Sequence, residues 1–155
     1  MTTFEVIEAK PWHVGTVAHR IRCELGREVG RAGYDVHRSL RYAARASMVC
    51  LAWKIDGRIE AIGGVAAPLA ASDGHVWLAL TDRAVQFPVA MVREARRQLA
   101  RVSGTRRTLI TSVLEGDRPA RRFIEALGFR QFGKPEEIGE TRMILMEYRV
   151  MQDKN

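Results

Sequence analysis

The chain has 155 residues, a formal net charge of +7, 46% hydrophobic residues and 28% charged residues. This balance predicts one globular domain at 1–150 and a short tail at 151–155. No apolar run is long enough to span a membrane, and the first residues lack a signal-peptide pattern, so we expect a cytoplasmic protein. Two cysteines without metal-ligand spacing predict reduced thiols and no metal site.

Arginine dominates the basic residues, since only four of the 25 are lysine. The planar guanidinium group matches phosphate better than an ammonium does. We therefore expect an anionic ligand or partner. The arginines are spread along the whole chain, so charge alone does not separate a cofactor phosphate from nucleic acid.

The first half of the chain predicts a strand, two helices and three consecutive strands. Apolar residues recur at helical spacing after Pro11 and stop at a pair of glycines. Asp56 and Gly57 are typical of a hairpin turn between two of the strands. The expected elements are a strand at 4–9, helices at 11–30 and 37–46, strands at 47–55 and 58–67, a loop at 68–74 and a strand at 75–81.

The second half predicts two helices and three strands. The expected elements are an amphipathic helix at 87–102, a strand at 107–114, a short helix from Asp117, a strand from Phe129 and a last strand at 141–150. The whole order is β-α-α-β-β-β-α-β-α-β-β. It predicts an α/β (α+β) fold, in which a mixed sheet is flanked by helices.

The segment from Glu115 to Arg130 carries the most informative pattern. Asp117 is a good N-cap, Pro119 fits the first turn of a helix, and Gly128 ends that helix just before Phe129. A capped helix between two strands, closed by Leu-Gly-Phe, resembles the C-terminal half of the GNAT acyltransferase fold. The element order resembles that superfamily over nearly the whole chain. It implies a mostly antiparallel sheet of six to seven strands with about four helices.

The resemblance implies an acyl-CoA-dependent N-acyltransferase that moves an acetyl group from acetyl-CoA to an amine. The acceptor would be a small molecule or a protein. Asp117 stands where the family usually has asparagine. Ile124 replaces a tyrosine that often protonates the departing thiolate in these enzymes, and Ser112 is the candidate to act in its place.

The stretch from Leu80 to Ala90 departs from the family because it has no glycine. GNAT enzymes usually hold the pyrophosphate of CoA with bare amides of a glycine-containing loop here. The blocks 61–66 and 74–81 have a narrower likeness to GNAT-like phage proteins of the internal virion protein A type. Those proteins share the glycine-poor loop.

By the same resemblance, pantetheine would lie between the strand that ends at Thr81 and the strand at 107–114. Phosphates would meet the segment Val85 to Val89, assisted by Arg83 and by Arg121 on the following helix. An ordinary solvated helix face is the alternative for either arginine. The expected cofactor-binding residues are Ala79, Leu80, Thr81, Arg83, Val85, Gln86, Phe87, Val89, Asp117 and Arg121.

The catalytic candidates are Ser112, Thr81 and Glu60. The alternation around Glu60 predicts that it faces outward from its strand, and His75 is either a titrating group or a turn residue. Tyr34 and His37 fall in a loop that often lines the acceptor pocket in this family, with simple packing as the alternative.

Two classes of function remain open from the sequence. The leading one is the acetyltransferase. The other is a catalytically impaired GNAT-like binding module for a protein or nucleic acid, suggested by the missing tyrosine and the glycine-free loop. A homodimer is compatible with both.

Overall fold

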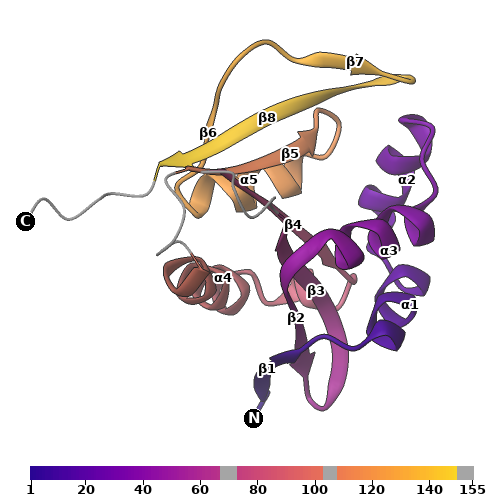
Figure 1. Ribbon diagram of the computed structural model, residues 1–155. Coiled ribbons are helices and arrows are strands. Elements are labelled where there is room, and N and C mark those ends of the chain that lie inside the picture. Colours follow the sequence, from indigo (N-terminus) through magenta and orange to yellow (C-terminus); the bar gives the residue numbers. More distant parts are fainter. Residues whose placement is uncertain (67–72, 103–107, 150–155) are drawn as a thin grey trace, which may run out of the picture.

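The computed structural model describes residues 1–66, 73–102 and 108–149. One mixed sheet runs through the molecule, with α1, α2 and α3 gathered apart from α4 and α5 (Figure 1). The helices are α1 (Pro11–His19), α2 (Cys23–Arg31), α3 (Val36–Ala46), α4 (Pro88–Val102) and α5 (Arg118–Ala126), with a short 3-10 turn at Ala84–Gln86. The expected tail at 151–155 and residues 68–72 of the expected loop lie outside the described residues.

The sheet has the order β1-β2-β3-β4-β5-β8-β6, and β7 also pairs with β8. All neighbours are antiparallel except β4 and β5, which are parallel. This confirms the mixed, mostly antiparallel fold class. The strands are β1 (Phe4–Glu8), β2 (Ser47–Ile55), β3 (Arg58–Ala66), β4 (Asp73–Leu80), β5 (Thr108–Leu114), β6 (Arg130–Gln131), β7 (Glu136–Ile138) and β8 (Thr141–Arg149).

Two elements differ from the expected order. The helix expected at 11–30 is divided into α1 and α2, because Ile21 forms a β-bridge with Thr81 and the Arg22 N–H donates to the Leu80 carbonyl at 2.9 Å. Strand β7 was not expected, and it adds a short hairpin before β8. None of the helices in the described segments is long and apolar enough to cross a membrane.

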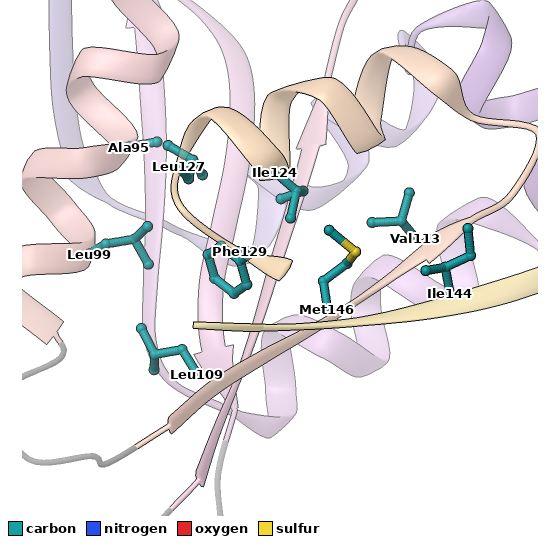
Figure 2. Packing of buried hydrophobic residues seen from close by; sticks show 9 residues of the cluster. All are labelled: Ala95, Leu99, Leu109, Val113, Ile124, Leu127, Phe129, Ile144 and Met146. Carbon is teal, nitrogen blue, oxygen red and sulfur yellow. The ribbon is translucent and has the colours of Figure 1, made fainter. Parts of the chain in front are cut away.

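The largest core cluster holds α4 and α5 against the β5–β8 part of the sheet. Figure 2 shows its buried side chains, which converge from both helices onto the strands. They are Ala95, Leu99, Leu109, Val113, Ile124, Leu127, Phe129, Ile144 and Met146. A second cluster, which includes Val14, Val17, Ile62 and Ala79, holds α1 on the opposite face.

The expected local signals are present. The Asp117 carboxylate accepts the Ala120 N–H at 3.2 Å, as an N-cap should. Gly128 has φ of 101°, which is the left-handed conformation of a helix stop. Asp56 and Gly57 have φ of 49° and 80°, as a two-residue hairpin turn requires.

Candidate functional site

Strands β4 and β5 form a wedge. Within the described residues, they are paired only from Asp73 to His75 and from Thr108 to Ile110. Beyond these residues the two strands continue separately to Leu80 and Leu114, each still paired with its outer neighbour. The inner edges of both strands are therefore open to a ligand along the second half of their length.

The backbone groups that face the wedge follow from the hydrogen bonds at its outer edges. Thr81 N–H donates to the Glu60 carbonyl at 3.0 Å, so Leu80 and Leu78 turn their backbone groups toward the wedge. On β5, the Glu115 N–H donates to the Arg142 carbonyl at 2.7 Å. The backbone groups of Leu114 and Ser112 therefore point into the wedge in the same way.

This geometry revises the backbone groups expected to meet pantetheine. Ala79 and Thr81 direct theirs toward β3, because their positions alternate with Leu78 and Leu80. The Leu80 carbonyl is already bonded to Arg22. Leu78 and Ser112 thus each direct both a backbone N–H and a backbone carbonyl into the wedge, where a ligand can bond to them.

A cavity of about 610 Å³ opens from the wedge and is bordered by α2, α3, α4 and α5. Its volume lies within the usual range for small-molecule sites. Six of the expected site residues line it, namely Tyr34, Ala79, Leu80, Val85, Ser112 and Asp117.

The other expected site residues do not line this cavity: His37, Glu60, Thr81, Arg83, Gln86, Phe87, Val89 and Arg121. Several are held elsewhere by specific contacts. The Arg83 guanidinium binds Asp56 at 2.8 Å and lies over the ring of Phe87 at 5.6 Å. Arg121 binds Glu125 at 2.9 Å on the same helix.

The expectation that Glu60 faces outward is wrong, because its side chain is fully buried. Both carboxylate oxygens accept from the Arg20 guanidinium, at 2.9 and 3.0 Å, and one also accepts from the Thr81 hydroxyl. A carboxylate buried with these partners anchors the α1–α2 junction to the sheet. It does not reach the cavity as a base.

Arg122 is a cavity-lining residue that the sequence reasoning did not name. It lines the cavity, whereas its neighbour Arg121 does not. Consecutive residues of an α-helix are separated by about 100° around its axis, so two adjacent arginines face different directions and only one of them faces the wedge. The helical phase set by Phe123 and Ile124, both cavity-lining residues, was the available signal.

The amino terminus of α4 begins beside the wedge. The Phe87 N–H donates to Ala84 and the Met91 N–H donates to Phe87, both through normal helical or turn bonds. In the first turn of α4, the N–H groups of Val89 and Ala90 therefore have no acceptor within the helix, and Pro88 has no N–H. Pro88 and Val85 line the cavity at this end.

Arg22 and Asp117 form a buried ion pair at the open end of the wedge. Only 5% and 1% of their surfaces are exposed. Arg22 was missed because the sequence predicted a continuous helix there. Asp117 was expected to bind cofactor, but its carboxylate is engaged by Arg22 and by the α5 cap.

His75 also lines the cavity, at the narrow end of the wedge. It lies within β4, so the turn interpretation is wrong. It is paired with Ile110, and Ser112 follows Ile110 by two residues, so His75 and Ser112 share one face of the sheet. Burial lowers the pKa of His75 below its usual value of 6.5, which favours the neutral imidazole.

Comparison with solved structures identifies the fold. The chain aligns over 97% of its length with a putative phosphinothricin N-acetyltransferase, at a TM-score of 0.70 and 12% identity, and covers 100% of that chain. The chain has the GNAT acetyltransferase fold.

Two further neighbours agree. A GNAT-family acetyltransferase from Streptococcus pneumoniae matches with a TM-score of 0.62 and 16% identity, over 96% of this chain and 100% of that one. The microcin C7 self-immunity acetyltransferase MccE, whose structure contains acetyl-CoA and AMP, matches with a TM-score of 0.67 and 8% identity. The match covers 95% of this chain and 92% of that one. No family model matches the sequence, and comparison with curated proteins finds no match.

Proposed function

We propose that this protein transfers an acetyl group from acetyl-CoA to an amine. The observation that carries the proposal is the wedge, in which two parallel strands separate and leave inner backbone groups open to a 610 Å³ cavity. The GNAT neighbours that contain acetyl-CoA or CoA support a cofactor of this type.

The residues present fit such a cofactor. Pantetheine carries amide groups, which the Leu78 carbonyl and the Ser112 peptide group complement along the wedge. The amides of Val89 and Ala90 and the Arg122 guanidinium provide hydrogen-bond donors for phosphate. A glycine-free loop is compatible with this arrangement, because the helix amides supply donors without help from the loop.

The chemistry divides among three groups in this proposal. Acetyl-CoA supplies an activated acetyl group and a thiol leaving group. The Leu78 N–H would donate a hydrogen bond to the thioester carbonyl oxygen, and the Ser112 hydroxyl would donate a hydrogen bond that stabilises the departing thiolate. The neutral His75 imidazole would accept, by way of water, the proton that the amine loses, and this proton would then pass to the thiolate to give free CoA.

The test mixes the protein with acetyl-CoA and each of a panel of amines, and a thiol reagent detects the CoA that is released. We expect amine-dependent release by the unaltered protein, and at least about a tenfold lower kcat for Ser112→Ala with unchanged affinity for acetyl-CoA. A protein that binds acetyl-CoA but never releases CoA would be a binding module instead. The narrower likeness to phage proteins of the internal virion protein A type stays a prediction.

A further inference from the structure

One side of the cavity is lined by residues of α2, α3, the loop between them and the start of β8, and we call this side the acceptor lobe. Its side chains are almost entirely apolar, and the six that define it are Leu25, Val29, Tyr34, Val36, Leu40 and Met143. All are partly or half exposed, as the walls of an open cavity should be. The phosphate-binding groups proposed above lie on α4 and α5, so this lobe is left for the second substrate.

The lobe offers no carboxylate for a cation among the described residues that line the cavity. The lining charges are Arg22, Asp117 and Arg122, and the first two neutralise each other. Glu28 is the buried acid of α2, but it does not line the cavity.

The Glu28 carboxylate is also engaged by other groups of the chain. It accepts from Arg31 at 3.1 Å and from the Thr141 hydroxyl at 3.3 Å. A Cβ at Gly116 would lie 2.2 Å from it, so the carboxylate is packed against the chain as well. A second ammonium group of an acceptor would therefore find no counter-ion.

We propose that the acceptor is a small primary amine carried on an apolar body, with no second charge. This inference rests on the proposed function and names the substrate class for the same site. Apolar walls stabilise an apolar body by burial, at about 25 cal/mol per Å². They disfavour an unpaired charge, which excludes polyamines and aminoglycosides, and they help the amine to lose its proton.

The test compares three acceptors at saturating acetyl-CoA: phenethylamine, spermidine and phenylalanine. We expect kcat/KM for phenethylamine to exceed that for spermidine by about 100-fold or more, because the additional ammonium groups have no partner. Phenylalanine should be at least about tenfold poorer than phenethylamine, because its carboxylate is desolvated in the lobe. A preference for spermidine or phenylalanine overturns the proposal.

A charge introduced into the lobe should reverse the preference. In Val29→Glu we expect at least a tenfold loss for phenethylamine and a gain for spermidine, with unchanged acetyl-CoA affinity. Tyr34→Glu repeats the test at a side chain that is 50% exposed and tolerates replacement more easily. Tyr42→Glu is the matched control, since Tyr42 lies on α3, is 75% exposed and does not line the cavity. It should keep the original preference.

Calorimetry with acetyl-CoA separates two kinds of failure. If acetyl-CoA does not bind to the folded protein, the proposed function fails and this inference fails with it. If acetyl-CoA binds and another amine is acetylated but phenethylamine is not, or if both lobe variants keep the original preference, only the substrate class is overturned.

Discussion

Arg22 joins the two strands of the wedge at its open end. Its backbone N–H donates to Leu80 at the end of β4, and its guanidinium binds Asp117, which follows β5 and caps α5. Both side chains are almost completely buried. One residue of the α1–α2 junction thus connects the two strands where they are no longer paired with each other.

Replacement of Asp117 by asparagine should destabilise the protein by about 3–5 kcal/mol. Asparagine keeps the helix cap, but it leaves the buried Arg22 guanidinium with only the half-exposed Glu24 carboxylate, 3.6 Å away, as a counter-ion. Urea unfolding measures the change. Arg121→Met, which removes the exposed ion pair with Glu125, is the control and should cost less than about 1 kcal/mol. Equal effects of the two variants would show that burial of the Arg22–Asp117 pair has no energetic consequence.

Gly64→Ala should also destabilise the protein, by about 1–3 kcal/mol. A Cβ there would lie 2.4 Å from the Val49 carbonyl oxygen and 2.9 Å from the Ser47 hydroxyl, where β2 has an irregular register. Gly15→Ala on α1 meets nothing within 4 Å and should stabilise by about 0.5–1 kcal/mol. Thermal unfolding distinguishes the two, and a neutral Gly64→Ala would be evidence against the close approach of these strands.

His13 should make stability fall as the pH drops below about 6.5. Burial, then Lys54 and Lys10, lower its pKa, and its Nδ1 accepts the Lys10 N–H at 2.9 Å. As the pH falls, His13 of the unfolded chain therefore takes up a proton before His13 of the native state does. The free energy of unfolding then decreases as the pH drops below the pKa of His13 in the unfolded chain. His13→Asn keeps an acceptor but cannot titrate. Its free energy of unfolding should fall less between pH 7.5 and 5.5 than that of the unaltered protein, and an equal fall would exclude His13 as a cause.

Two adjacent arginines should differ in their effect on acetyl-CoA binding. Arg122 lines the cavity, so Arg122→Ala should weaken binding about tenfold, and less at high salt. Arg121 is held by Glu125 and by Gln131 at 3.1 Å, so Arg121→Ala should leave binding unchanged. Calorimetry of both variants measures this difference. The reverse order would place the cofactor phosphates on the other side of α5.

Local signals predicted much of the fold, and long-range contacts account for the differences. The cap at Asp117 and the turn at Gly57 depend on neighbouring residues, and both were predicted correctly. The break between α1 and α2 was not, because it depends on hydrogen bonds between Arg22 and a strand far along the chain. The burial of Glu60 was missed for the same reason, since its partner Arg20 lies 40 residues away.

The site was predicted less completely than the fold. The resemblance located the wedge and led to Ser112, which lines the cavity. It named Arg121, whereas Arg122 lines the cavity, because the sequence alone does not fix the rotation of a helix against a sheet. The peptide groups of Leu78 were missed because their direction depends on the register between β3 and β4.

Isothermal titration calorimetry with acetyl-CoA tests the central claim most directly. The protein should bind one acetyl-CoA per chain with a Kd between about 1 µM and 1 mM. Ser112→Trp, which fills the wedge, should abolish binding, whereas Tyr42→Trp outside the cavity should retain it. Absence of binding at millimolar acetyl-CoA, with the protein folded, would contradict the account.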